Sequence, residues 1–348
     1  MTKRPGESDD RWFVRRVLIV LALTALVFLA WHLRHLVLML FGAVVVATIF
    51  RSLGDRIAKW TGCREGIAVA ISIALILGAG VGLVALFGSH VGGQMGILAD
   101  RLPAAWASFE ARIGDMGLGE QLRRIVESAG QSGSFATFSS ALLSIGNGIA
   151  ETLVVIVAGI FLATQPRFYR TGAIKLVPAG KRALVAEAMD ESERALHLWL
   201  KGQLIAMVVV GLLVGFGLWL LGVPSAFALG LLAGLLEFIP FAGPILSAIP
   251  AVLLALAVGP DFALWVALLY FAVQQFEGYV LTPLVQQFAV DLPGVVLLFS
   301  LLGFGALFGT LGIILAAPLS VVMYVLVKRL YVIEALHTAT PIPGEDKK

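Results

Sequence analysis

Leu235-Leu236-Glu237-Phe238-Ile239-Pro240-Phe241-Ala242-Gly243-Pro244 interrupts one of the most apolar parts of this 348-residue chain. Glu237 is the only charged side chain between Gly202 and Pro260. A carboxyl group surrounded by membrane-grade apolar sequence is costly to hold ionised, and such residues mark functional sites. The two prolines break the helical hydrogen-bond ladder, and broken backbone at membrane depth needs protein or a water-filled cavity to satisfy it. The stretch therefore predicts a bent membrane segment that carries a transport site.

Composition indicates a membrane protein. The chain is 59% hydrophobic and 14% charged, whereas soluble domains are roughly 45–50% apolar and about 25% charged. Many uncharged tracts approach the roughly 20 residues that cross a bilayer as a helix. We therefore expect an all-α polytopic membrane protein. Its net charge of +3 is spread over several loops, which argues against nucleic acid as a partner.

The N-terminal region has two apolar runs, Val17 to Ala30 and Leu36 to Phe50, separated by Trp31-His32-Leu33-Arg34-His35. This pattern predicts two short membrane helices joined by a turn. One long bent helix is the alternative, because no glycine or proline marks the turn. Gly66 to Phe87 predicts a third span.

The middle of the chain alternates in polarity. The mixed sequence from His90 to Asn147 predicts a helical insert on or near the membrane, and Thr152 to Thr164 forms most of a fourth span. Basic residues then precede an amphipathic helix at Ala183 to Leu200. The excess of Lys and Arg after the second and fourth spans places those loops in the cytoplasm by the positive-inside rule.

In the C-terminal half, a fifth span at Gln203 to Gly222 leads into the apolar tract Ala226 to Gly259. A straight helix of that length would reach about 50 Å at 1.5 Å per residue, well beyond the roughly 30 Å hydrocarbon core. The tract must therefore fold back on itself, and the prolines Pro240 and Pro244 mark the bend. A re-entrant hairpin or a pair of short tilted helices fits this length.

The pattern of span plus broken tract then recurs. Phe262 to Val280 forms a span ended by Leu281-Thr282-Pro283, and a second apolar tract follows Gly294 and runs uncharged to Val327. Glycines break this tract at Gly303, Gly305, Gly309 and Gly312. The string from Gly243 to Pro250 resembles that from Gly312 to Pro318 once a one-residue gap is allowed. We interpret the two units as an inverted repeat and hypothesise alternating access, because breaks at corresponding places in two halves point to a transporter's site.

A second polar cluster lies before Pro283. Gln274 and Glu277 share a helix face, because residues three and four apart are neighbours, and a carboxylate beside amides can bind a cation, a proton or a polyhydroxylated solute. The alternative is that Glu277 lies at the cytoplasmic interface of the membrane and has no role in transport. Glu237 can carry a proton only where burial outweighs nearby cations. The predicted pathway residues are Glu237, Pro240, Gly243, Pro244, Gln274, Gln275, Glu277 and Pro283.

Other chemistry finds no support in the sequence. The five histidines lack metal-ligand spacing, no Ser, Cys or Asp constellation suggests covalent catalysis, and no phosphate-binding loop suggests ATP hydrolysis. We therefore predict no enzymatic activity, no cofactor and no metal site. Glycine pairs four residues apart predict close helix packing in the bilayer, at Gly78 and Gly82, Gly211 and Gly215, Gly230 and Gly234, and Gly305 and Gly309.

Four strings together resemble the autoinducer-2 exporter family of bacterial permeases. They are Leu220 to Ala226, Glu237 to Pro244, Gln275 to Val285 and Leu307 to Leu319, and the resemblance covers the chain from about Arg16 to Tyr331. It implies an inner-membrane secondary transporter with about eight membrane segments, driven by an ion gradient and assembled as a homo-oligomer. The chain departs from the family pattern between its first two spans, where relatives often carry prolines.

The resemblance leaves the substrate open. A secondary transporter that exports a small polar organic solute is the leading hypothesis, because some relatives are linked to autoinducer-2 export. A sodium or lithium/proton antiporter that uses Glu237 and Glu277 is the second, and a non-transporting structural membrane protein is the third. The expected partners are membrane lipids and a small-molecule or ion substrate.

The expected organisation has both termini in the cytoplasm. Its parts are a cytoplasmic N-terminus (1–16), three membrane spans (17–88), an extracytoplasmic amphipathic helical insert (89–147), a fourth span (148–165), a cytoplasmic amphipathic segment (166–201), a transport core with two span-plus-hairpin units (202–330) and a flexible cytoplasmic tail (331–348).

Overall fold

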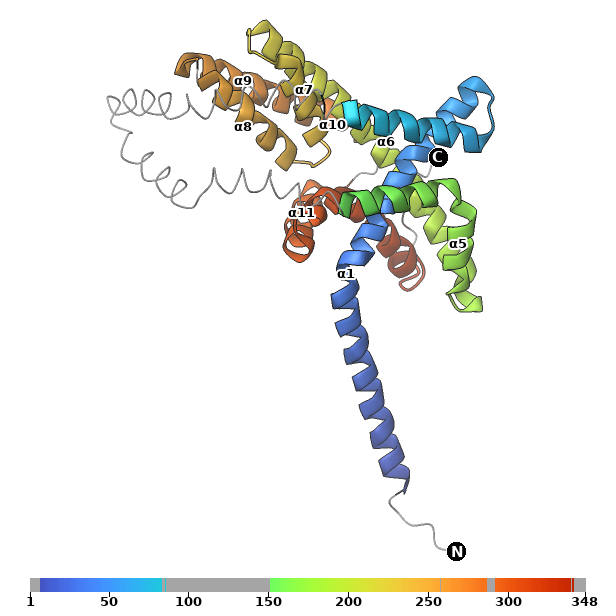
Figure 1. The fold of residues 1–348 in the computed structure, drawn as a ribbon. Helices are drawn as coiled ribbons and strands as arrows, with labels where there is room; N and C mark the ends of the chain where they lie inside the picture. Colours follow the sequence, from blue (N-terminus) through green and yellow to red (C-terminus); the bar gives the residue numbers. More distant parts are fainter. Residues whose placement is uncertain are drawn as a thin grey trace, which may run out of the picture.

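The computed structural model describes residues 7–82, 85, 151–256, 258–286, 292–338 and 340. These residues are predominantly helical, and no strand occurs among them (Figure 1). Within these ranges five helices are long and apolar enough to cross a membrane, and a bent pair would make a sixth. The predicted all-α polytopic membrane protein is confirmed. The insert predicted at 89–147 lies outside the described residues.

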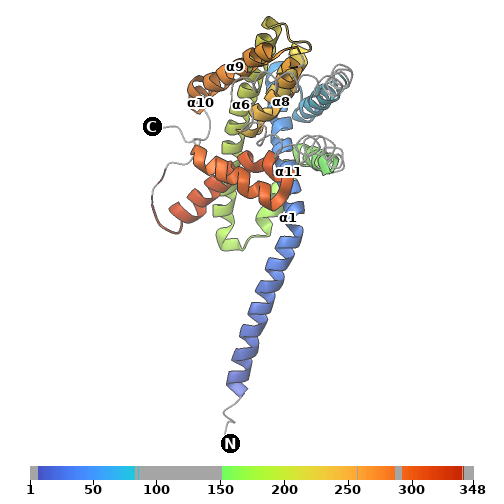
Figure 2. The same cartoon turned by 90° about the vertical axis from the view of Figure 1, so that its left-hand side faces the viewer.

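The N-terminal region forms a single helix, α1 (Glu7–Thr61), of 55 residues. At 1.5 Å per residue it is about 80 Å long, and its first part projects from the rest of the molecule (Figures 1 and 2). The turn predicted at Trp31 to His35 is therefore wrong, and the alternative of one helix is observed. His35 is accommodated within the helix because its Nε2 lies 3.2 Å from Oε1 of Glu151.

Two apolar helices, Glu65–Gly82 and Glu151–Thr164, pack against α1. They are followed by α5 (Pro166–Lys175), a short 3-10 turn η1 (Ala179–Lys181) and the 39-residue α6 (Arg182–Leu220). The predicted amphipathic helix and the predicted fifth span are thus one helix, without the separation expected between them. No proline interrupts α6, and only Gly202 lies at that point, so helical hydrogen bonding continues through it.

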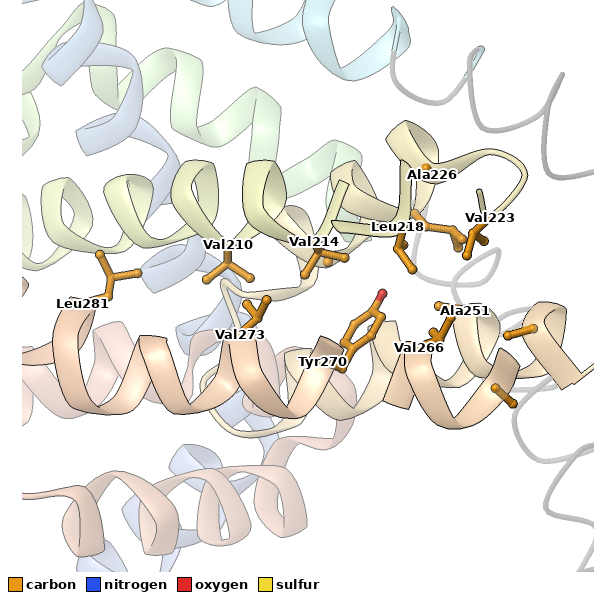
Figure 3. Packing of buried hydrophobic residues seen from close by; sticks show 14 residues of the cluster. Val210, Val214, Leu218, Val223, Ala226, Ala251, Val266, Tyr270, Val273 and Leu281 are labelled. Carbon is orange, nitrogen blue, oxygen red and sulfur yellow. The ribbon is translucent and has the colours of Figure 1, made fainter. Parts of the chain in front are cut away.

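The helix α6 and the three helices after it form the part of the molecule that holds the site. After α6 come α7 (Ala226–Leu236), α8 (Ala242–Leu256) and α9 (Pro260–Phe276). Their inward side chains form one apolar core with α6, with Val214 and Leu218 facing Val266 and Tyr270 (Figure 3). The backbones of α6 and α7 approach closely, because a Cβ added to Gly230 would lie 2.7 Å from the carbonyl oxygen of Gly211.

This contact supports the packing predicted for two of the glycine pairs. Gly211 and Gly215 on α6 face Gly230 and Gly234 on α7. The pair of Gly78 and Gly82 differs, since a Cβ on either would meet no described atom within 4 Å. Gly309 lies at a bend, where its φ of 68° is in the left-handed region. It was predicted to pack against a neighbouring helix.

The chain continues from α9 through a π-helical turn, η2 (Glu277–Leu281), into α10 (Thr282–Gln286). The helical path therefore passes Pro283, where the sequence predicted its end. A later helix, α11 (Gly294–Leu326), leads into a second π-helical segment, η3 (Val327–Ile333). Arg329 of η3 forms ion pairs with Glu187 and Glu191 of α6, the latter at 3.6 Å, and α11 packs between α6 and α1.

Both broken tracts are confirmed as bends, and their turns share a feature. In the first, Phe241 has a φ of 64°, and a Cβ on Gly243 would collide with the carbonyl group of Leu236 at the end of α7. The turn thus brings the start of α8 against the last carbonyl of α7. Only a residue without a side chain leaves room for this contact.

The second bend repeats this arrangement within α11. Gly309 has a φ of 68° and a ψ of −145°, and a Cβ on Gly312 would collide with the carbonyl group of Phe304. The interval from Phe304 to Gly312 is one residue longer than that from Leu236 to Gly243, so the two turns differ in length. The inverted orientation of the two units stays a prediction.

Candidate functional site

A small cavity lies where α6, the turn after α7, α8 and α9 meet. The centre of a water molecule can occupy a volume of about 10 Å³ in this cavity. The cavity therefore has room for about one water. Apolar side chains from α6 and α9 form part of the wall, and polar side chains from α8, α9 and η2 complete it. The lining residues are Val210, Val214, Glu237, Pro244, Ser247, Tyr270, Val273, Gln274 and Glu277.

Glu237 is positioned by the end of α7. It is the C-cap of that helix, its N–H donates to the carbonyl oxygen of Ala233 at 2.9 Å, and its own carbonyl oxygen accepts 2.6 Å from Nε2 of Gln203 on α6. The residue is only 3% exposed. Its Oε2 is buried without a hydrogen-bond donor among the described residues, so these bonds fix the backbone of Glu237 and leave this carboxyl oxygen unsatisfied.

Glu277 provides a second carboxyl group from η2. Nε2 of Gln274 donates to its Oε2, and Glu277 lines the same cavity as Glu237. Two ionised carboxylates are acceptors only, so at one cavity they repel each other. A proton or a cation bound there lowers this repulsion.

Tyr270 and Ser247 form the other polar wall. The hydroxyl group of Tyr270 donates to the carbonyl oxygen of Ser247 at 3.1 Å. The hydroxyl group of Ser247 donates to the carbonyl oxygen of Pro244 at 3.0 Å. The first bond joins α9 to α8, and the second lies within α8. Neither residue was predicted, although Tyr270 lies four residues before Gln274 and seven before Glu277, a spacing that places all three on one helix face.

Replacing Tyr270 with phenylalanine removes this link between α8 and α9. We expect the free energy of unfolding in detergent to fall by about 1 kcal/mol, the usual net contribution of one hydrogen bond. Tyr279→Phe is the matched control, because Tyr279 is 77% exposed. Equal unfolding curves for the two variants would contradict a structural role for the Tyr270 hydroxyl group.

The predicted site residues separate into three groups. Glu237, Pro244, Gln274 and Glu277 line the cavity, so the structure brings residues from both predicted clusters together. Pro240 and Gly243 shape the adjoining turn. The remaining two, Gln275 and Pro283, are exposed and do not line the cavity. A transport role for all of them stays a prediction.

The donor set suits a proton or a monovalent cation. The lining residues of the cavity include two carboxyl groups, two hydroxyl groups and one amide, and hard cations prefer oxygen ligands. Within the part of the chain that the structure describes, no three His, Cys, Asp or Glu residues cluster in a way that could hold a metal ion. The oxygen atoms of the lining side chains are therefore the groups that could accept a proton or a small cation.

Comparison with known proteins identifies a transporter family. The family model described as AI-2E family transporter matches residues 18–331. The chain is similar to "Putative transport protein YrrI" of Bacillus subtilis, with 31% identity over 151 residues, which are 43% of each chain. It is also similar to a "Putative transport protein" of Thermotoga maritima, with 29% identity over 195 residues, which are 53% of this chain and 59% of that protein.

A longer match joins the chain to "AI-2 transport protein TqsA" of Escherichia coli K12. The identity is 23% over 292 residues, which are 81% of this chain and 82% of TqsA. The matches to the Bacillus and Thermotoga proteins, in contrast, span about half the length of those relatives.

Proposed function

Because the chain belongs to the AI-2E transporter family, we propose that it is a secondary transporter of the bacterial inner membrane that exports a small polar organic solute. Glu237 and Glu277 form its coupling site. The observation that carries this proposal is the meeting of two carboxyl groups, from the α7–α8 turn and from η2, at one buried cavity.

The proposed mechanism follows from the position of each carboxyl group. Glu237 lies on the bent α7–α8 unit, whereas Glu277 lies at the end of the long α9 path. A proton or cation between them stabilises the closed arrangement, and its release leaves two like charges that repel. Relative movement of the two elements then opens the cavity, in keeping with alternating access at broken helices.

The cavity's size favours a second candidate, a sodium or lithium/proton antiporter. Pockets for organic ligands usually measure about 300–1,000 Å³, whereas this cavity has room for about one water. A proton or a single dehydrated cation fits it in the described conformation. An organic solute requires the α7–α8 unit to move away from α9.

Purified protein in liposomes separates the candidates. Vesicles loaded with autoinducer-2 and a pH-sensitive dye report solute efflux and internal proton concentration while sodium, lithium or potassium is added outside. Solute efflux without cation dependence supports the exporter. Proton movement driven by sodium or lithium, with no solute efflux, supports the antiporter. Absence of both fluxes would contradict a transport function and leave a structural membrane protein.

A matched pair of variants connects the flux to the site. Glu277→Gln keeps the size of the side chain but removes its charge, and we expect the coupled flux to fall about tenfold, equal to about 1.4 kcal/mol in a barrier. Glu193→Gln, at an exposed position of α6, also removes one carboxyl group and is expected to transport normally. Similar fluxes in Glu277→Gln and the parent would remove Glu277 from the coupling site.

A further inference from the structure

The helix α5 turns sharply from the apolar helix that precedes it. The axes of Glu151–Thr164 and α5 meet at 92° (Figure 1). Gln165 between them has non-helical φ and ψ angles of −129° and 51°, and Pro166 begins α5. Because the preceding helix is apolar whereas α5 is rich in basic residues, we expect the sharp turn between them to place α5 along the membrane surface.

The burial of α5 gives it an inner and an outer face. Pro166, Arg170 and Ile174, spaced by four residues, are partly buried and face the protein. On the opposite face Phe168 is 71% exposed and Leu176, directly after the helix, is 89% exposed. A surface helix that leaves large apolar side chains uncovered suits the boundary between lipid headgroups and acyl chains.

The charge of this segment has one sign. Between Pro166 and Ala186 the chain carries Arg167, Arg170, Lys175, Lys181 and Arg182 and no Asp or Glu. Two of these residues hold the segment in place, because Arg170 pairs with Asp190 of α6 at 2.5 Å and Arg182 donates to the carbonyl oxygens of Val177 and Lys175. The other three basic residues are exposed.

We propose that residues 166–182, the α5 platform, bind the headgroups of anionic phospholipids. Phe168 and Leu176 enter the acyl boundary, while Arg167, Lys175 and Lys181 bind lipid phosphates. The fixed platform presents these charges at headgroup level, where each basic residue attracts the negative membrane surface. This inference does not depend on which solute or ion is transported.

A fluorophore placed on the platform tests the proposal. Gly172→Cys in a Cys63→Ser background gives one labelling position, since Cys63 is the single cysteine and a Cβ on Gly172 meets no described atom within 4 Å. The protein is reconstituted in phosphatidylcholine vesicles. Quenching by headgroup-labelled nitroxide phosphatidylglycerol is then compared with quenching by the same derivative of phosphatidylcholine.

We expect phosphatidylglycerol to quench about fivefold more efficiently, the factor for roughly one basic contact near a membrane. Arg167→Gln with Lys175→Gln should lower the ratio, because Lys181 is then the one phosphate-binding residue left of the three, whereas Arg167→Lys should retain the preference. The matched control, Arg194→Gln with Lys201→Gln, removes two exposed charges from α6 and should leave the ratio unchanged. High salt should reduce the preference by screening.

The proposal is overturned by a ratio near one in the parent, by an unchanged ratio in the Arg167 and Lys175 double variant, or by equal losses in that variant and the α6 control. Inorganic phosphate added in excess tests a water-soluble ligand. Abolition of the lipid preference by phosphate, at constant ionic strength, would assign the platform to a soluble anion instead of a lipid.

Discussion

Glu237→Gln is expected to lower the coupled flux in proteoliposomes by at least about tenfold, equal to about 1.4 kcal/mol in the transport barrier. Glutamine has nearly the same size and does not disturb the bond from Gln203 to the backbone carbonyl of residue 237. It cannot, however, gain or release a proton. The variant therefore removes the charge of the buried group while it preserves the shape of the turn.

The stability of this variant distinguishes a functional loss from misfolding. Glu237 is 3% exposed and its Oε2 has no donor among the described residues, so a neutral amide avoids the cost of ionising a buried group. We expect the melting temperature in detergent to stay the same or to rise. Glu193→Gln, on an exposed part of α6, is the control for loss of one carboxyl group. Unchanged flux with unchanged pH dependence in Glu237→Gln would exclude the coupling role.

Gly243→Ala and Gly312→Ala are each expected to lower the free energy of unfolding by about 1–3 kcal/mol, the usual cost of forcing extra atoms into a packed region. The new methyl group would collide with the carbonyl of Leu236 in the first case and of Phe304 in the second. Backbone atoms cannot rotate away as a side-chain tip can. The bend must therefore open, and the arms of the tract must separate.

Gly303→Ala is the matched control within α11. A Cβ at Gly303 meets no described atom within 4 Å, and alanine is favoured over glycine in a helix by up to about 1 kcal/mol. Thermal unfolding of the three variants in the same detergent gives the comparison. Equal or higher stability of Gly312→Ala relative to Gly303→Ala would show that the bend around Gly309 is not closed as described.

The centre of the cavity could be predicted because its signals are local. A single carboxyl group in a long apolar tract, followed by two prolines, indicates Glu237 without any knowledge of tertiary contacts. Glu277 and Gln274 could be placed on one helix face by their spacing. Glu237 meets Gln274 and Glu277 only because the α7–α8 bend packs against α9. No residue pattern in the sequence indicates that packing.

The misplaced helix ends have a similar cause. Trp31 to His35 reads as a polar turn, but polar side chains do not end a helix when they find partners, as His35 does with Glu151. The separation expected near Leu200 fails for the same reason, since a change from amphipathic to apolar sequence leaves backbone hydrogen bonding intact. Tyr270 escaped prediction because its partner, the carbonyl oxygen of Ser247, belongs to another helix.

The two glycine-to-carbonyl contacts also bear on how the two halves of the core can change in sequence. Each bend depends on backbone atoms and on one missing side chain, so the arms on either side are free to exchange one apolar residue for another. Over many substitutions such arms would lose their likeness, whereas the glycines could not be replaced. The predicted repeat would then be recognisable mainly near the two glycines, where the strings that begin at Gly243 and Gly312 resemble each other.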